Sequence, residues 1–208
     1  MTDCTVIGGG PVGLVFAALN NSKKNKIQLF EAKESDASHQ DTRALALSNG
    51  TRLIMERIGV WGDLKKNLIN INKIHTSQAN TFGRTLLDAK EFNEASLGYI
   101  ISYGDLMKCL TKKVRSLSDV EIFYETKVSK CIDERGLLKL SVQTKNQPRD
   151  IKTKFVILAD GANNKIKGIE LNQTFKNLNH SAIVTKLTTE LSHQNTAYER
   201  FTPEGPIA

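Results

Sequence analysis

The chain has 208 residues, of which 39% are hydrophobic and 25% are charged, and its formal net charge is +7 at pH 7. This length allows one large or two small domains with a substantial core, and the hydrophobic fraction excludes a disordered chain. The lysines are spread along the whole sequence without an interleaved aromatic platform, so we expect no nucleic-acid partner.

Cysteine and histidine spacing argues against metal sites and disulfides. The cysteines are odd in number and have no C-x-x-C spacing: Cys4, Cys109 and Cys131. Neither a disulfide framework nor a thiolate metal site is therefore expected. The histidines stand far apart, and no metal is predicted. The chain opens without a charged-then-apolar leader and has no run of about 18 apolar residues, so we expect a cytoplasmic protein, soluble or peripherally bound at the inner membrane.

The first elements of the chain are a predicted strand, a glycine turn and a helix. The apolar residues 5–7 fit a buried parallel strand. Three glycines follow in the pattern G-x-G-x-x-G: Gly8, Gly10 and Gly13. In this pattern they make the sharp turn, let the backbone approach a pyrophosphate, and let the helix pack on the sheet, respectively. Pro11 lies near the first helical position, where its missing N–H removes no bond within the helix. The free N–H groups of the first turn, to which Val12 belongs, can therefore face an anion.

A second predicted strand at residues 27–30 ends in an acid. Glu31 lies 18 positions after Gly13, about where this fold places a carboxylate that holds the two hydroxyls of an adenosine ribose. A carboxylate there disfavours a 2′-phosphate, so the pattern favours FAD or NAD over NADP. The alternative is a glycine-rich turn that binds nothing, against which the strand, helix and acid argue together.

The middle of the chain mixes helices with inserted strands. We expect a loop at residues 32–42, a short strand at 43–48, and then a helix capped by Ser48 or Asn49. The apolar residues expected on one face of this helix are Leu53, Ile54 and Ile58. Residues 71–92 read as antiparallel strands. A strongly amphipathic helix follows, with this apolar stripe: Leu106, Leu110, Val114 and Leu117.

The last third is predicted to consist of strands. Four runs with turns between the last three suggest a meander: 120–124, 127–132, 137–143 and 151–154. Residues 155–159 are almost continuously apolar and predict a buried strand of the main sheet. This strand would deliver Asp160 and Gly161 to the carboxyl edge, where open α/β sheets bind ligands. Residues 181–188 and 196–201 again read as strands.

Four features together resemble the class A flavoprotein aromatic hydroxylases, most closely the ubiquinone-biosynthesis hydroxylases of UbiH type. The glycine turn with Glu31 looks like the ADP-binding start of that family. Residues 41–48 are similar to its second block, in which an arginine contacts the cofactor, and Arg43 is the matching position. Residues 158–162 look like its D-G motif, whose aspartate serves the flavin and the nicotinamide nucleotide. Residues 195–208 resemble a substrate-domain segment of the ubiquinone branch.

The resemblance implies a fold and a domain division. It implies a Rossmann-like FAD-binding domain of the glutathione-reductase type with an inserted antiparallel β substrate domain, incomplete at the C-terminus. We expect residues 1–70 and 99–166 to form the FAD-binding domain. Residues 71–98 and 167–208 would form part of a β-sheet substrate domain.

The activity implied is hydroxylation of the phenolic ring of a polyprenylated ubiquinone precursor, with FAD as cofactor and NAD(P)H and O2 as co-substrates. The protein would supply binding, orientation and exclusion of water, so no catalytic side chain is assigned. Implied partners are the polyprenylphenol substrate, the membrane surface, and other ubiquinone-biosynthesis proteins or a second copy of the chain.

The sequence also departs from the family pattern. Asn164 and Lys167 stand where the family has a serine and an arginine, and Gly104 stands where related chains carry an arginine or a glutamine. The later G-D motif is missing and family members are about twice as long, so we expect a truncated chain. Two alternatives stay open: a non-catalytic FAD-binding remnant, and a flavin- or NAD-dependent dehydrogenase.

Overall fold

The computed structural model contains two compact units, each described here by itself. The described residues are 2–22, 25–145, 147–161, 166–172, 174 and 176–208. The first unit consists of Met1–Gln40 and Leu106–Ala182, and the second of Asp41–Asp105 and Ile183–Ala208. This division by contacts groups residues 41–70 with the inserted strands, whereas the sequence assigned them to the FAD-binding domain. Which residues belong to that domain in the functional sense stays a prediction.

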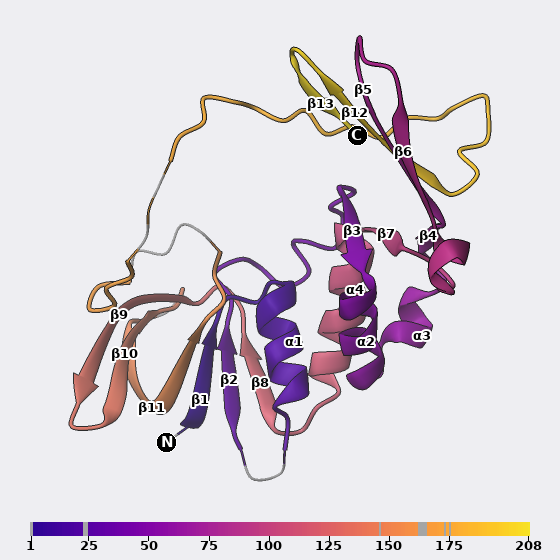
Figure 1. Ribbon diagram of the computed structural model, residues 1–208. Helices are drawn as coiled ribbons and strands as arrows, with labels where there is room; N and C mark the ends of the chain where they lie inside the picture. Colours follow the sequence, from indigo (N-terminus) through magenta and orange to yellow (C-terminus); the bar gives the residue numbers. More distant parts are fainter. Residues whose placement is uncertain (1, 23–24, 146, 162–165, 173, 175) are drawn as a thin grey trace. The chain divides into compact units, whose positions relative to one another are not determined.

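The first unit is built on a six-stranded sheet of order β8-β2-β1-β11-β10-β9, whose strands run side by side in Figure 1. The strands are β1 (Thr2–Ile7), β2 (Ile27–Phe30), β8 (Val120–Phe123), β9 (Lys127–Glu134), β10 (Leu137–Gln143) and β11 (Arg149–Leu158). Strands β8, β2, β1 and β11 are parallel, and β9 and β10 add an antiparallel meander. The predicted pairing of residues 5–7 with residues 155–158 is confirmed, because Val6 pairs with Ile157.

Two helices contribute to the core of this unit. Helix α1 (Pro11–Leu19) contacts β1 and β2 and buries Leu14 and Ala17. Helix α4 (Tyr103–Arg115) buries Leu106, Leu110 and Val114, as its stripe predicted. A second cluster of buried residues includes side chains of β1, β2, β9 and β10: Ile7, Phe30, Val128, Cys131, Leu140, Val142 and Ile166. This cluster contains Ile7 and Phe30, the last residues of β1 and β2, and so fixes the carboxyl ends of both strands.

Strand β11 corrects two predictions. Residues 151–154 and 155–159 were expected as separate strands, but one continuous strand runs through both. The expectation that residues 155–159 are buried is also wrong, because Phe155 is 66% exposed and Val156, Ile157 and Leu158 are only half-buried. Helix α1 packs on β1 and β2 (Figure 1), and it borders β11 only across a cavity lined by Phe16, Phe155 and Ile157.

The second unit begins with a three-stranded antiparallel sheet and two short helices. The sheet has the order β3-β7-β4, formed by β3 (Ala44–Ser48), β7 (Gly98–Ser102) and β4 (Ile69–Ile71). Helix α2 (Asn49–Arg57) begins where predicted, since the Ser48 hydroxyl accepts the Thr51 N–H at 3.2 Å. The predicted apolar face is partly wrong, because Leu53 and Ile54 are 56% and 41% exposed. The buried side chains here are Met55 and Ile58, followed by α3 (Trp61–Leu64).

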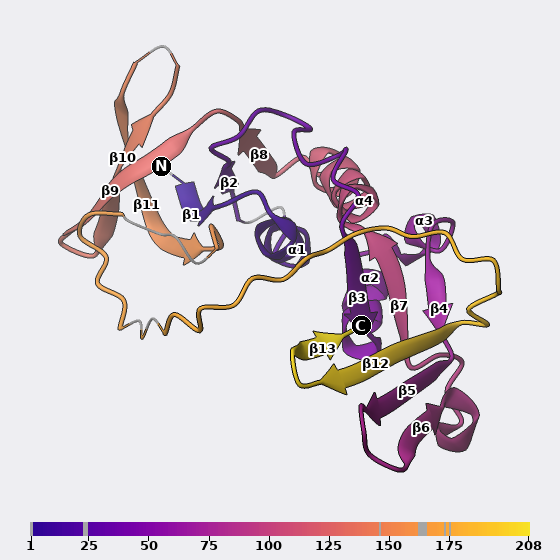
Figure 2. The same ribbon diagram turned by 90° about the horizontal axis from the view of Figure 1, so that it is seen from above.

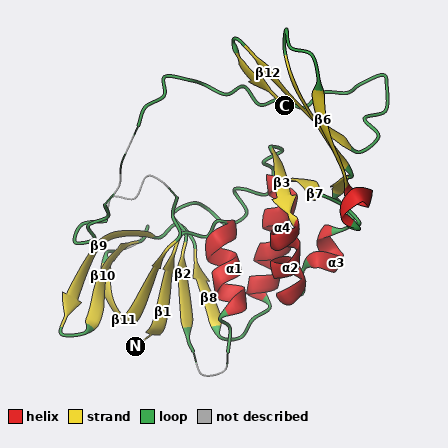
Figure 3. Cartoon of the chain, in the orientation of Figure 1, coloured by secondary structure: helices red, strands yellow, loops and turns green. Residues whose placement is uncertain are grey.

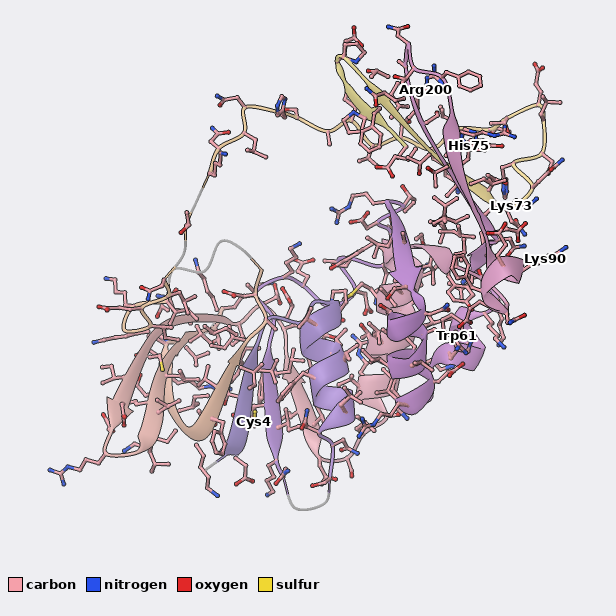
Figure 4. All side chains as sticks on the ribbon, viewed as in Figure 1. Cys4, Trp61, Lys73, His75, Lys90 and Arg200 are labelled. Atoms are coloured by element: carbon pink, nitrogen blue, oxygen red, sulfur yellow. The ribbon has the colours of Figure 1, made fainter. Side chains whose placement is uncertain are left out.

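A four-stranded sheet completes the second unit, and Figure 2 shows β12 between β13 and β5. Its strands are β5 (Lys73–Gln78), β6 (Arg84–Asp88), β12 (Thr196–Thr202) and β13 (Gly205–Ile207), and the short helix η1 (Ala89–Phe92) follows β6. The predicted antiparallel hairpin within residues 71–92 is confirmed by the pairing of β5 with β6. His75 and Arg200, labelled in Figure 4, lie on this sheet.

One predicted strand does not form. Residues 181–188 have no regular structure, and Figure 3 draws this stretch as loop. The apolar side chains there are exposed, for example Ile183 at 95%. A strand is stabilised by hydrogen bonds to a neighbouring strand. Among the described residues, no strand pairs with this stretch. The prediction at residues 196–201 is confirmed by β12.

Candidate cofactor-binding site

The glycine turn leaves no room for a side chain at Gly8. This residue follows β1, has a φ of +108°, and donates its N–H to the Phe30 carbonyl oxygen at 2.8 Å. A Cβ atom at this position would lie 2.4 Å from the Ala159 carbonyl oxygen. Both the backbone conformation and the approach of β11 therefore require glycine.

The start of α1 is arranged to receive an anion. Gly13 packs so closely that a Cβ atom there would lie 2.0 Å from the Gly8 carbonyl oxygen. The helix begins at Pro11, with Gly10 at the N-cap, and has neither a side-chain cap nor an acid in its first turn. The N–H groups of a first turn have no partner within the helix, and the helix dipole is positive there. A pyrophosphate would satisfy both features.

Glu31 is held in a defined position at the end of β2. Its Oε2 accepts the Gly9 N–H at 2.7 Å, and its Oε1 accepts the Lys33 N–H at 2.8 Å. The backbone of Glu31 is fixed as well, by a bond of 2.9 Å from its N–H to the Phe123 carbonyl oxygen. Each carboxylate oxygen retains acceptor capacity, so the hydroxyls of a ribose can still bind here.

Asp160 follows β11 at the same edge of the sheet. The N–H of its neighbour Ala159 donates to the Ile7 carbonyl oxygen at 2.8 Å, which ties this segment to β1. Asp160 is exposed, and partial desolvation of its carboxyl raises the pKa above its ordinary value. Gly161 has a φ of +83°, and residues 162–165, including Asn164, lie outside the described residues.

These residues share one cavity within the first unit. Its volume is about 350 Å³, and it is lined by Ile7, Gly8, Phe30, Glu31, Ala32, Lys33, Thr126, Lys127, Val128, Asp160 and Ile166. The structure thus brings the predicted Gly8, Glu31 and Asp160 together at the carboxyl ends of β1, β2 and β11, where α/β sheets bind ligands. Sequence reasoning missed Lys33 and Lys127, because a lysine among many dispersed lysines gives no signal.

Arg43 belongs to the second unit, immediately before β3. Its Nε donates to both Asp41 carboxylate oxygens, at 3.0 and 2.9 Å, and its Nη2 donates to Oδ2 at 2.6 Å. The guanidinium also lies 5.2 Å from the centre of the Tyr103 ring. The exposed guanidinium is therefore held by Asp41 and Tyr103 of its own unit, and its role toward a cofactor stays a prediction.

Lys167 and Gly104, two departures from the family pattern, have backbone roles. The Lys167 N–H donates to the Ser129 carbonyl oxygen at 3.0 Å, and its own carbonyl accepts the Cys131 N–H at 2.8 Å. The Gly104 N–H donates to the Asp41 carbonyl oxygen at 2.8 Å. All three bonds join segments that are distant in sequence.

A parallel sheet with a glycine turn, an acid at the end of the second strand and a cavity at its carboxyl edge defines a nucleotide-binding α/β domain. The FAD binding domain family matches residues 1–198, and the chain belongs to this family. The described residues contain no group of three or more histidine, cysteine or acidic side chains that could hold a metal ion. Within the same residues, no helix has the length and apolar composition needed to cross a membrane.

Curated relatives of this chain include proteins named as ubiquinone biosynthesis monooxygenases. The zebrafish (Danio rerio) ubiquinone biosynthesis monooxygenase COQ6 is 30% identical over 99% of this chain and 46% of its own length. The human COQ6 protein is 26% identical over 99% of this chain and 47% of its own length. An uncharacterised Synechocystis protein, slr1300, is 24% identical over 99% and 50%, respectively. The chain thus spans about half the length of the curated relatives it matches.

Solved structures share the fold. The p-nitrophenol 4-monooxygenase PnpA from Pseudomonas putida superposes with a TM-score of 0.65 and 18% identity, over 77% of this chain and 40% of that protein. The flavin-dependent monooxygenase PieE, solved with FAD and substrate, has a TM-score of 0.65 and 14% identity over 79% and 31%. The expected fold class, an FAD-binding α/β domain with inserted β-structure, and the resemblance to the FAD-dependent aromatic hydroxylases are confirmed.

Proposed function

We propose that this chain is the FAD-binding half of a monooxygenase that hydroxylates the phenolic ring of a polyprenylated ubiquinone precursor. The observation that carries the proposal is the alignment of 99% of the chain with relatives named as ubiquinone biosynthesis monooxygenases. The cavity beside the glycine turn supports it, because its residues suit the adenosine and pyrophosphate of FAD. The proposed substrate and the use of NAD(P)H follow from the family resemblance.

The residues of this chain have distinct tasks in the proposal. The first turn of α1 faces the pyrophosphate and Glu31 accepts the ribose hydroxyls. The family resemblance implies that Arg43 contacts the cofactor and that Asp160 serves the flavin and the nicotinamide nucleotide. Bound FAD supplies the redox chemistry by passing two electrons from NAD(P)H to O2. In the balanced reaction one oxygen atom enters the ring and the other leaves as water, while NAD(P)H and a proton are consumed. The protein orients the reactants and excludes water.

The polyprenyl tail bears on location and partners. A substrate with such a tail partitions into a membrane, so the proposed enzyme works in the cytoplasm at the periphery of the inner membrane. Reaching the substrate there requires contact with the membrane surface. Association with other ubiquinone-biosynthesis proteins, or with a second copy of the chain, would place the substrate near the flavin.

The experiment is an assay of the purified chain with FAD, NAD(P)H, ¹⁸O-labelled O2 and a polyprenylphenol. Saturable FAD binding supports the proposal, and failure to bind FAD overturns it. The chain spans about half of its relatives, so we expect no hydroxylation by the chain alone. Fusing it to the unmatched part of the zebrafish relative should then yield product that carries ¹⁸O.

The same assay separates a second candidate function, a non-catalytic FAD-binding remnant, from the first. The remnant predicts FAD binding without labelled product in either form of the assay. A dehydrogenase would instead oxidise NAD(P)H without moving oxygen into a phenol. Hydroxylation by the chain alone at about 1 per second or faster, a normal enzymatic rate, would show that the unmatched half is dispensable.

A further inference from the structure

We propose that Gly9 is a positioning residue that sets the nucleotide specificity of the site by holding the Glu31 carboxylate in place. The inference rests on the proposed function, because it assumes that Glu31 binds the ribose of an adenine nucleotide. Gly9 occupies an x position of the G-x-G-x-x-G pattern, so the pattern gives it no role. The role proposed here comes from its contacts with Glu31 in the structure.

The space beside Gly9 is filled by Glu31. A Cβ atom at Gly9 would lie 2.9 Å from the Glu31 Cβ, 2.9 Å from its Oε2 and 3.2 Å from its Cγ, and these are the three nearest atoms. Gly9 is buried, and its φ lies outside the left-handed region. Glycine is therefore required at this position because Glu31 occupies the space of a side chain, and not because the backbone conformation demands it. Any side chain there would push Glu31 away.

The backbone of Gly9 also binds the carboxylate that it makes room for. Its N–H donates to Oε2 at 2.7 Å, and the Lys33 N–H fixes the other oxygen at 2.8 Å. Hydrogen bonds to a charged acceptor are stronger than those between neutral groups. With both oxygens bound, the carboxylate cannot easily swing aside. Gly9 and Lys33 thus orient Glu31 before any nucleotide arrives.

A fixed carboxylate discriminates between two kinds of ribose. The 2′- and 3′-hydroxyls can donate to the remaining lone pairs of Glu31. A 2′-phosphate is anionic at pH 7, cannot donate in the same way and is repelled by the carboxylate. The repulsion is largest when the carboxylate cannot move. Gly9 therefore contributes to the preference for an unphosphorylated ribose through Glu31.

The test is a double-mutant cycle of Gly9→Ala and Glu31→Gly, with Gly62→Ala as control. Glu31→Gly removes both the carboxylate and the Cβ, so alanine at position 9 then has room. Apart from its chain neighbours and the backbone of its own helix, no atom of the described residues lies within 4 Å of a Cβ at Gly62. Affinities for FAD are measured by fluorescence titration, and those for ADP and its 2′-phosphorylated analogue by competition. A thermal melt of each variant reports folding.

We expect Gly9→Ala to weaken FAD binding about ten- to a hundredfold, as for loss of a charge-assisted hydrogen bond. The preference for ADP over the 2′-phosphorylated analogue should fall severalfold. In the Glu31→Gly background, Gly9→Ala should change affinity by less than about twofold, since coupled residues are not additive. Gly62→Ala should bind like wild type.

Three results would overturn the inference: unchanged binding by Gly9→Ala, equal weakening of both nucleotides, or full additivity with Glu31→Gly. If Gly9→Ala fails to fold, the double variant decides, because the inference predicts that it folds and binds like Glu31→Gly. A double variant that stays unfolded would contradict it. If wild type binds neither FAD nor ADP, the proposed function itself fails.

Discussion

At the scale of single residues, we expect the glycine turn and the end of β2 to carry the affinity for the cofactor. Gly10→Val should abolish FAD binding, because a branched side chain would fill the space for the pyrophosphate. Glu31→Ala should weaken binding about ten- to a hundredfold, since a hydrogen bond to a charged group is worth roughly 1.5–3 kcal/mol. The control is Glu56→Ala, which removes an acid paired with Arg52 on α2 at 2.8 Å. Titration showing wild-type affinity in both site variants would refute the assignment.

The Asp160 carboxyl should make a pH-dependent contribution to stability. Partial desolvation raises the pKa of this exposed carboxyl in the folded state, so ionised Asp160 lowers the free energy of unfolding slightly at pH 7. Asp160→Asn should therefore raise the melting temperature at pH 7 while weakening FAD binding. The gain should vanish near about pH 3, where aspartate is protonated in both states. A melting temperature that falls at pH 7 would show that the charge of Asp160 is stabilised in the fold.

Among the elements, α4 and α2 carry leucines in opposite environments. Leu110 on α4 is fully buried, whereas Leu53 on α2 is 56% exposed. Leu110→Ala should lower the free energy of unfolding by about 2–5 kcal/mol, because it removes buried methyl groups and leaves a cavity. Leu53→Ala should cost less than about 1 kcal/mol. Urea unfolding of the pair measures the difference, and equal costs would contradict the described packing.

The contrast between these helices shows how far the sequence alone could lead. In α4, the cations in the last turn, among them Lys112 and Lys113, lie off the apolar stripe, so the buried side was predictable. In α2, apolar residues lie on more than one side of the helix. Contacts with neighbouring elements decide that Met55 is buried while Leu53 is exposed. The glycine spacing and the distance to Glu31 predicted the candidate site. The contact of Gly9 with Glu31 was not predictable, because the pattern does not say which side chain reaches the turn.

Strand predictions failed where a partner was needed. The alternation within residues 181–188 favours a strand, but no described strand pairs with it and none forms. The apolar run at residues 155–159 predicted burial, and β11 does lie between β1 and β10 in the sheet. Whether the face of β11 is buried depends on which elements pack against the sheet, and the local sequence does not encode this.

For the whole molecule, the partly exposed face of β11 should cause self-association. Phe155 is 66% exposed and lines a cavity of about 320 Å³ together with Cys4, Phe16 and Ile157; Cys4 is labelled in Figure 4. Contiguous exposed apolar surface promotes association. Phe155→Ser should therefore reduce both aggregation in light scattering and binding of a hydrophobic dye.

The control is Phe82→Ser, at a fully exposed phenylalanine in the turn between β5 and β6. A single exposed phenylalanine is common on protein surfaces, so this change should have little effect. If Phe82→Ser reduced association as much as Phe155→Ser, the face of β11 would not be the cause.

The central claim, that the first unit binds FAD through its adenosine and pyrophosphate, is tested most directly by competition. Wild-type chain is titrated with FAD, and bound FAD is then challenged with ADP or with riboflavin. We predict saturable FAD binding that ADP displaces and riboflavin does not, because the cavity beside Gly8 and Glu31 receives the nucleotide end. The absence of saturable binding, or displacement by riboflavin and not by ADP, would contradict the account.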